Sequence, residues 1–265
     1  MRKWFLAAIA CIVFVGSLSA ASIAALTDDL EGYWPLDGNA SDDGGNGLDG
    51  TINGNVVPSE DRFGDPNGAM KFPGNMSDHI DVGNPTQLQI TGAMTLAAWA
   101  RIDDYETNGR IVAKQAGGGS RCWSLNVESE QYGRVGAFHI SIDGNELILG
   151  TTQGPLEFGP DEWFHIAGVY DPGNSVSIYI NGELDNAVTD GIPDTQFNNN
   201  ANVNIGRRPD CCPMDGSVDD VIIWSRALSA DEVRQAMGKG GPFATTTAAV
   251  KSVGKLTATW GAIKY

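Results

Sequence analysis

Acidic and amide side chains crowd a twenty-residue segment near the start of the chain, where their oxygens could bind a cation. This segment, Gly32 to Thr51, contains four Asp, two Asn and six Gly. Calcium prefers six to eight oxygen ligands from carboxylates, amides and carbonyls. Asp37 and Asn39 fit the first ligand positions of an EF-hand. Asp42 then stands where that motif needs Gly, and Leu48 where it needs Glu. The segment is not an EF-hand, so a calcium site here needs ligands from elsewhere in the chain.

A second acidic pair, Asp219 and Asp220, lies in the apolar run SVDDVIIW. On a regular strand the two side chains point to opposite faces, so one of them faces away from solvent or toward a neighbouring loop. A buried carboxylate needs a partner, and a cation is a natural one. The alternative for the first segment is that its Asp and Asn residues form turns and cap their own backbone. A cation site and a solvated crossing between strands both remain open from the residues alone.

Residues for other kinds of chemistry lack the necessary companions. His79, His139 and His165 lie far apart without metal-binding spacing, which argues against zinc. Glycoside hydrolysis needs two carboxylates about 5–10 Å apart. The closest pair, Glu128 and Glu130, has no third acid to support it, and the GxSxG motif of serine hydrolases is absent. We therefore predict that the protein is not an enzyme.

The chain has four cysteines, and Cys11 lies in the N-terminal segment that is interpreted below as a signal peptide. An exported chain can keep a disulfide. We predict that Cys122 pairs with Cys211 or Cys212, without a choice between the two, because a bridge between adjacent cysteines is strained. The alternative is that all three stay reduced, since Cys also serves as a small apolar residue.

The N-terminus predicts export. Arg2 and Lys3 precede an apolar run from Trp4 to Val15, and small residues follow. This pattern is typical of a secretory signal peptide, which we assign to residues 1–24 with cleavage between Ala20 and Ala25. An uncleaved membrane anchor is the alternative, because the run could extend toward membrane-spanning length. We expect a secreted or cell-surface protein with no other membrane segment.

Composition restricts the partners. The 265 residues carry a formal net charge of −16, which disfavours nucleic acid and anionic membranes. The 265 residues are enough for one large all-β domain or two small ones. Hydrophobic residues make up 42% of the chain, which is enough for a packed core.

The elements that must position these residues are short strands. Apolar and polar residues alternate with a period of two from residue 78 to 224, between clusters of Gly, Pro, Asn and Asp. In MTLAAWARI the alternation places one set of residues on a single face: Met94, Leu96, Ala98, Ala100 and Ile102. Asn181-Gly182 and Asp143-Gly144 are hairpin signals, because such turns need positive φ. Many short strands without crossover helices predict two packed antiparallel sheets.

One helix is predicted, in LSADEVRQAMG. Ser229 and Glu232 form a capping box, and Leu228 and Val233 fit the hydrophobic staple around it. We expect this helix at the edge of the sandwich. Residues 241–265 are small, polar and linker-like, with room for one short strand near the end.

Several blocks together resemble laminin-G-like domains: GYWPLDGNASDDGGNGLDGT, GAMKFPGNMSDHIDVG, MTLAAWARI, WFHIAGVYDPGNSVSIYINGE and VNIGRRPDCCPMDGSVDDVIIWSRALSADEV. The blocks follow the family's order over about residues 30–237, and we place the domain at 27–240. The resemblance implies a concanavalin A-like jellyroll of two curved antiparallel sheets. It implies function only loosely, because glycan binding, adhesion and accessory modules of secreted enzymes share this architecture.

The resemblance also suggests a calcium site. Some laminin-G-like domains hold calcium with a segment like the first loop and with the acid before the final strand. By that resemblance the expected ligands are Asp37, Asn39, Asp43 and Asp219.

A recognition surface would use aromatic rings and polar groups fixed by loops. The loop candidates are Tyr105, Tyr132 and Phe158, together with Arg207, which could bind carboxylates or sulfates beside its neighbour Arg208. The alternative for each is a solvated surface residue. We expect a secreted module that binds a glycan or glycoprotein. The competing hypothesis is a structural or adhesive surface component attached through its tail.

Overall fold

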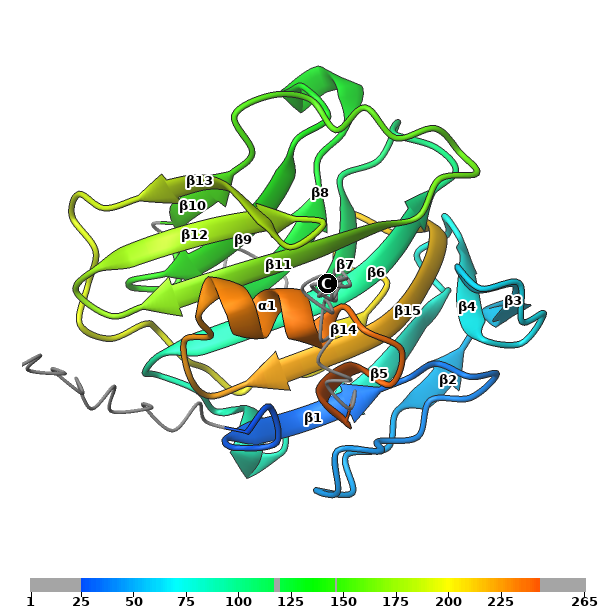
Figure 1. Ribbon diagram of the computed structural model, residues 1–265, viewed down its shortest axis with the longest axis horizontal. Helices are drawn as coiled ribbons and strands as arrows, with labels where there is room; N and C mark the ends of the chain where they lie inside the picture. The colour runs from blue at the N-terminus through cyan, green and yellow to red at the C-terminus, as the bar shows by residue number, and fades with distance from the viewer. Residues whose placement is uncertain (1–24, 117–119, 146, 244–265) are drawn as a thin grey trace, which may run out of the picture.

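Two antiparallel β-sheets face each other in the computed structural model, which describes residues 25–116, 120–145 and 147–243 (Figure 1). The predicted signal segment and residues 244–265 of the predicted tail lie outside the described residues. The eight-stranded sheet contains, in spatial order, β13 (Glu183–Val188), β12 (Ser175–Ile180), β11 (Phe164–Asp171), β6 (Met94–Ile102), β15 (Asp215–Trp224), β4 (Ala69–Pro73) and β3 (Val57–Ser59), with β1 (Leu30–Trp34) paired to β15. The seven-stranded sheet contains β10 (Leu147–Thr151), β9 (Gly136–Ser141), β8 (Arg121–Val127), β7 (Gly109–Gln115), β14 (Val203–Ile205), β5 (His79–Gly83) and β2 (Thr51–Asn53). The predicted two-sheet jellyroll is confirmed.

The main core lies between the sheets and follows from the period of two. All five residues that the alternation in β6 places on one face belong to this core, as predicted. On the facing sheet, Trp123, Leu125 and Val127 of β8 point into the same core. Each fully buried large apolar side chain contributes about 1.5–3 kcal/mol to folding. The sheets therefore hold together through their inner faces and leave the outer faces free to carry polar groups.

The helix α1 (Ala230–Ala236) covers the outer face of the eight-stranded sheet instead of its edge, which corrects our expectation (Figure 1). Beneath it lies a second apolar cluster that includes Leu228, Val233 and Trp224. The predicted capping box is confirmed: the Ser229 N–H donates to Glu232 Oε2 at 2.8 Å, and the Glu232 N–H donates to Ser229 Oγ at 3.3 Å. Within the described residues, no helix has both the length and the apolar character to cross a membrane.

The predicted hairpin at Asn181-Gly182 joins β12 and β13, and both residues have positive φ, 50° and 78°. The connection between β9 and β10 contains Gly144 with φ 93°, in agreement with the second predicted turn. Short 3₁₀ helices complete the description: η1 (Thr86–Leu88), η3 (Glu130–Tyr132) and η4 (Gly241–Phe243). The last of these packs near β1, where the rings of Phe243 and Tyr33 lie 5.9 Å apart.

Candidate functional site

The outer face of the seven-stranded sheet carries a row of polar side chains that are nevertheless buried. Because Trp123, Leu125 and Val127 face the core, Ser124 and Asn126 of β8 face outward. Residues opposite each other on paired strands share a face, which adds Arg110 opposite Asn126 and His139 opposite Ser124. Ser124 and Asn126 are 0% exposed, so something must cover this part of the sheet.

The covering segment is the loop between β14 and β15, and it contains a disulfide. Cys211 and Cys212 are bonded to each other, and Cys122 is a free, buried thiol. Our prediction of a bridge from Cys122 was therefore wrong. Burial raises the pKa of the Cys122 thiol to about 11. Cys212 has φ 65°, a conformation that L residues rarely adopt. The bridge that forms is the one between adjacent cysteines, which our strain argument had set aside.

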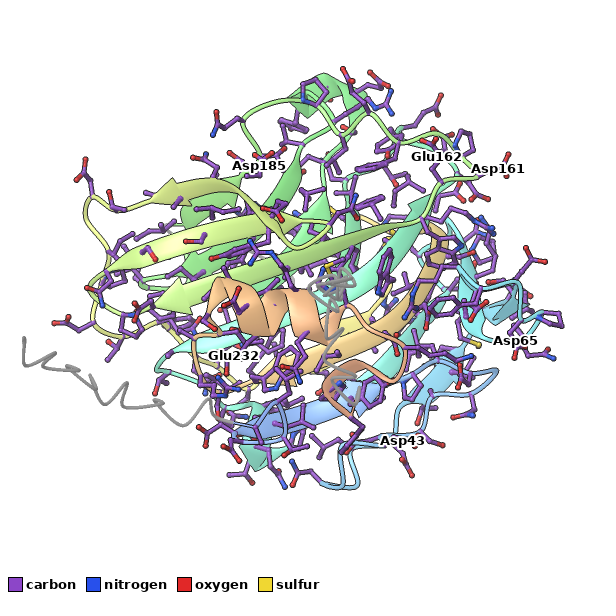
Figure 2. The ribbon with its side chains drawn as sticks, viewed as in Figure 1. Asp43, Asp65, Asp161, Glu162, Asp185 and Glu232 are labelled. Atoms are coloured by element: carbon purple, nitrogen blue, oxygen red, sulfur yellow. A yellow bond between two sulfur atoms is a disulfide. The ribbon has the colours of Figure 1, made fainter. Side chains whose placement is uncertain are left out.

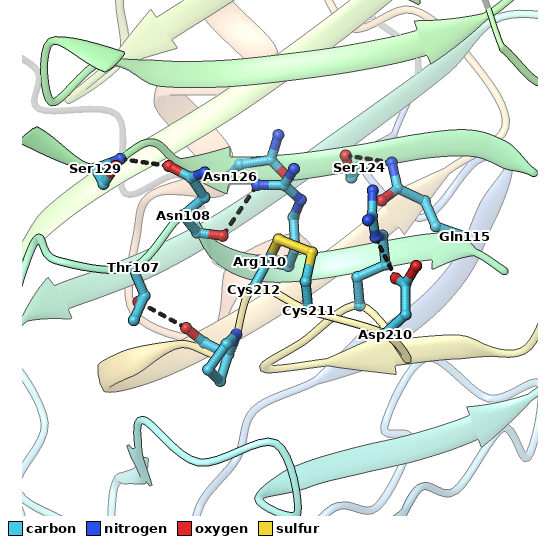
Figure 3. Close-up of a disulfide and its surroundings, with 12 residues drawn as sticks. Thr107, Asn108, Arg110, Gln115, Ser124, Asn126, Ser129, Asp210, Cys211 and Cys212 are labelled. Carbon is cyan, nitrogen blue, oxygen red and sulfur yellow. Dashed lines mark hydrogen bonds and ion pairs between the residues drawn. A yellow bond between two sulfur atoms is a disulfide. The ribbon is translucent and has the colours of Figure 1, made fainter. Parts of the chain in front are cut away.

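Hydrogen bonds hold this loop against β7 and the residues just before it. The Arg110 N–H of β7 donates to the Cys212 carbonyl at 3.2 Å. The Thr107 hydroxyl donates to the Pro213 carbonyl at 2.8 Å (Figure 3). Arg208 and Cys211 exchange backbone hydrogen bonds across the loop itself, at 3.1 and 3.2 Å. The disulfide is thereby placed directly beside the Arg110 side chain (Figure 3).

Loop and sheet together enclose a polar cavity of about 300 Å³, which we call the disulfide cavity. It is lined by Asn108, Arg110, Gln115, Arg121, Glu128, Tyr132, His139, Arg208, Cys211 and Cys212. Arg110 Nη1 donates to the Asn108 carbonyl at 3.0 Å and to Glu128 Oε1 at 3.3 Å. Gln115 Nε2 donates to Ser124 Oγ at 3.1 Å (Figure 3). A fixed hydrogen-bond network therefore orients the side chains of the floor.

His139 is neutral in this network at physiological pH. Burial is the main cause, and the charges of Arg110 and Arg121 add to it, so that the pKa of His139 falls to about 3. Its ring lies 3.1 Å from Asn126 Nδ2 and 3.7 Å from Glu128 Oε1. Burial also lowers the pKa of Arg110, as do the nearby guanidinium groups of Arg208 and Arg121, while Glu128 opposes the shift. The positive charges of the cavity therefore repel one another.

Buried polar atoms of the disulfide cavity lack hydrogen-bond partners within the protein. Two are acceptors, Gln115 Oε1 and the neighbouring Asn126 Oδ1, and two are donors, Arg110 Nε and Arg121 Nε. Gln115 is 1% exposed and Arg110 is 7% exposed. Unpaired groups at such depth are costly unless a ligand or solvent pairs with them. The cavity thus offers both donors and acceptors to a bound molecule.

The predicted ligand-binding residues divide into two groups. Tyr132 lies at the disulfide cavity and is 58% exposed. Arg207 lines an adjacent cavity that shares Gln115 with it, and donates to the Met76 carbonyl at 2.6 Å. Tyr105 and Phe158 do not join them. Tyr105 is 8% exposed and packs under the guanidinium of Arg134, and the Phe158 ring stacks on Phe164 at 4.6 Å.

A second charged group, which we call the Arg62 cluster, lies on the outer side of the eight-stranded sheet. Arg62 bonds to both Asp219 and Asp220, the second contact being 2.7 Å, and its guanidinium stacks 4.6 Å above the Trp99 ring. The expectation that the two carboxylates point to opposite faces was wrong. β15 bulges here against β6, and Asp220 has φ 49°, which turns both side chains toward Arg62.

A cavity of about 190 Å³ at this cluster is lined by Asp37, Asp61, Asp219 and Asp220 together with Tyr33, Arg62 and Lys239. The Tyr33 hydroxyl donates to Asp220 Oδ1 at 2.5 Å. Burial, and after it the Asp220 carboxylate, raises the pKa of Asp219 in spite of Arg62. Burial and neighbouring carboxylates also raise the pKa of Asp37. Burial and the neighbouring carboxylates therefore favour the protonated form of both acids.

The four residues expected to bind calcium are only partly brought together. Asp37 and Asp219 line the same cavity, whereas Asn39 and Asp43 do not. Asn39 Oδ1 accepts from the Ser41 N–H at 2.8 Å, which is an Asx turn, and Asp43 is exposed and points away from the body (Figure 2). In the described part of the chain, no three His, Cys, Asp or Glu side chains are grouped so that they could hold a metal.

The first acidic loop is organised by Asp42, a residue that the resemblance did not single out. Asp42 Oδ1 accepts from the backbone N–H groups of Tyr33 and Gly44, at 3.0 and 2.8 Å. Its Oδ2 accepts from the Leu48 N–H at 2.9 Å. Part of this segment therefore caps its own backbone, as the solvated alternative predicted.

Sequence reasoning missed most of the disulfide cavity. Arg110, Gln115 and Arg121 lie on strands or at strand ends, where alternation alone does not place them on one face, because the pairing of β7 with β8 shifts register twice. The signal that could have found them is the polar set on one face of neighbouring strands, combined with the adjacent cysteines of the loop.

The fold is a two-sheet antiparallel β-sandwich, and the comparison with known families agrees with it. A family model of the laminin G type, described as the concanavalin A-like lectin/glucanases superfamily, matches residues 73–234. The chain belongs to this superfamily. No curated protein matches the chain.

Solved structures share the fold at low identity. The binding domain of Paraclostridial Mosquitocidal Protein 1 matches with a TM-score of 0.65 and 16% identity, over 81% of this chain and 53% of that one. Domain 4 of AbnA, a GH43 extracellular arabinanase from Geobacillus stearothermophilus, was solved with arabinotriose. It matches with a TM-score of 0.59 and 20% identity, over 78% of this chain and 97% of that one. The binding domain of Botulinum Neurotoxin DC in complex with SialylT matches with a TM-score of 0.59 and 14% identity, over 78% of this chain and 50% of that one. The chain thus spans about half the length of these toxin domains and nearly all of the arabinanase domain.

Proposed function

We propose that the protein is a glycan-binding module and that the disulfide cavity is its binding site. The observation that carries the proposal is the set of buried donors and acceptors without protein partners, next to an exposed aromatic ring. Sugar hydroxyls both donate and accept hydrogen bonds, so they complement unpaired atoms of both kinds. The Tyr132 ring offers a plane for the apolar face of a sugar.

Similar folds support this function. The arabinanase domain was solved with arabinotriose, and one neurotoxin binding domain was solved with SialylT. At least one domain of this architecture, the arabinanase domain, therefore holds an oligosaccharide.

The test is a glycan array followed by calorimetry with the ligand that binds. Tyr132→Ala is expected to weaken binding about 5- to 30-fold, because it removes a stacking contact of about 1–2 kcal/mol. Phe63→Ala is the matched control, since Phe63 is 55% exposed but lies at the Arg62 cluster. Loss of binding in the Phe63 variant with retention in the Tyr132 variant would assign recognition to the other face. An array without any bound glycan would contradict the function itself.

The carboxylates favour binding over hydrolysis. Among the residues that line the disulfide cavity, Glu128 is the one acid, and it is paired with Arg110. Glu130 is 66% exposed in its side chain and forms an ion pair with Arg134. Hydrolysis of a glycosidic bond normally requires two carboxylates that face the substrate. Release of reducing sugar from a bound glycan, abolished by Glu128→Gln, would show that the module is an enzyme after all.

Calcium remains a proposal for the Arg62 cluster. Asp37 and Asp219 would supply carboxylates to it, because they line one cavity and because burial, and after it the neighbouring carboxylates, raises the pKa of each. A divalent cation would act there as a structural ion, joining the first loop to β15.

Thermal melting in calcium and in EDTA tests this site. A raised pKa in the folded state means that stability is present at low pH and is lost as the pH rises above the unfolded value of about 4. Calcium favours the ionised form and should reverse this loss, raising the melting temperature at pH 8 by several degrees. Asp219→Asn should abolish the calcium response. The absence of any shift at millimolar calcium would exclude the site.

Export also remains a proposal, since residues 1–24 lie outside the described part of the chain. A disulfide at Cys211–Cys212 is suited to an oxidising compartment, which supports secretion. Mass spectrometry of the mature protein tests it: cleavage between Ala20 and Ala25 is expected, and an intact N-terminus in the membrane fraction would favour the anchor.

A further inference from the structure

Arginine side chains converge on the disulfide cavity from three separate segments. Arg110 comes from β7, Arg121 from the start of β8, and Arg208 from the loop before β15. Glu128 is the one carboxylate among the lining residues, and His139 is neutral. The lining therefore has an excess of positive charge, in a chain whose formal net charge is −16.

The nearest carboxylates do not remove this excess. Glu128 contacts Arg110 at 3.3 Å, and Asp210 contacts Arg208 at 2.6 Å from the rim, where its side chain is 38% exposed. Arg121 Nε is buried without a hydrogen-bond partner in the protein. Among the described residues, two carboxylates contact the guanidinium groups of this set, and the Arg121 Nε donor has no protein acceptor.

We propose that the disulfide cavity selects saccharides that carry an anionic group, a carboxylate or a sulfate, and that Arg121 and Arg208 hold that group. This inference rests on the proposed glycan-binding function. A guanidinium presents paired N–H donors whose geometry matches carboxylate and sulfate oxygens. In a partly buried cavity the attraction is also less screened by salt than on an open surface. A bound anion lowers the mutual repulsion of the three arginines.

The experiment compares matched pairs of oligosaccharides by calorimetry: a uronate oligomer and its methyl ester, and a sulfated galactan oligomer and its desulfated form. The anionic member of a pair is expected to bind at least about 10-fold more tightly, as one charge-assisted contact implies. The first pair reports on carboxylates and the second on sulfates. The affinity of the anionic member should also fall with added NaCl, and that of the neutral member should not.

Arg121→Gln and, separately, Arg208→Gln should each bring the ratio of the affinities for the charged and the neutral member close to one, whatever either change does to the affinity for the neutral member. Arg234→Gln is the matched control, because Arg234 is an exposed arginine on α1 and should not change the preference. Equal binding of neutral and charged members would overturn the anion preference and leave glycan binding intact. Binding of neither member of any pair, and of no glycan on the array, would contradict glycan binding as a whole.

Discussion

Single residues in this protein are tuned by what the fold places beside them. His139 and His165 lie on the outer faces of different sheets, and burial lowers the pKa of each to about 3. The charge of Arg110 adds to this effect at His139, and that of Arg62 adds to it at His165. Both histidines are therefore neutral at pH 7.

Acid should destabilise the protein through these histidines. In the unfolded chain a histidine takes up a proton below about pH 6.5, but the folded state excludes it down to about pH 3. The stability contributed by each neutral histidine is therefore complete above pH 6.5 and is lost as the pH falls, by about 1.4 kcal/mol per pH unit. Between pH 7.5 and pH 4.5, the free energy of unfolding should fall by about 2–3 kcal/mol less in His165→Gln than in the unchanged protein.

Urea denaturation at both pH values measures this difference. The variant keeps every carboxylate of the parent protein, so the difference between the two pH slopes isolates His165. Parallel slopes for parent and variant would show that His165 takes up a proton without unfolding.

At the scale of elements, turns and caps fix where the helix meets the sheet. The hairpin between β12 and β13 presents Gly182 to α1, where an added Cβ would lie 2.6 Å from Met237 Sδ and 2.9 Å from Arg234 Cγ. Arg234 also forms ion pairs with Glu183 of the same hairpin, one of them at 3.1 Å. The hairpin therefore serves as a contact surface for the helix as well as a connection.

Gly182→Ala and Gly64→Ala should separate these two roles. Both glycines have positive φ, 78° and 88°, so each substitution should cost about 1–2 kcal/mol for the backbone conformation alone. Gly64 has no atom within 4 Å of the added Cβ, whereas Gly182 faces α1. Gly182→Ala should therefore lower the free energy of unfolding by about 1–3 kcal/mol more than Gly64→Ala, because the added methyl group is crowded by the helix. Equal losses in urea denaturation would mean that the helix moves aside freely.

At the scale of the whole molecule, three central strands serve both apolar clusters. In β6, Leu96 belongs to the main core and Ala97 to the cluster beneath α1; in β15, Ile223 and Ile222 divide in the same way. β11 follows the same pattern with its own residues. The layer under α1 therefore rests on strands whose other face closes the main core.

Shared strands predict a single cooperative unfolding transition. Trp224 reports on the cluster beneath α1, and Trp34 and Trp123 report on the main core. In urea, tryptophan fluorescence of the parent protein and of Trp224→Phe should change together with far-UV circular dichroism. An earlier transition that disappears in the Trp224 variant would show that the α1 layer unfolds independently.

The sequence by itself determined the elements of this protein. The period of two in β6 and β8, the Asn181-Gly182 turn and the Ser229 capping box all depend on near neighbours along the chain, and all are confirmed. Local sterics and the need to bury one face are sufficient to specify such features.

The tertiary structure alone decided the site. That Asp219 and Asp220 share a side depends on a bulge in the pairing of β15 with β6, which the alternation along the chain does not indicate. The disulfide cavity joins Arg110 and Arg121 to Cys211 because β7 lies beside β14 in the sheet. Strand order is set by burial summed over the whole core, and for that reason no short stretch of sequence carries it.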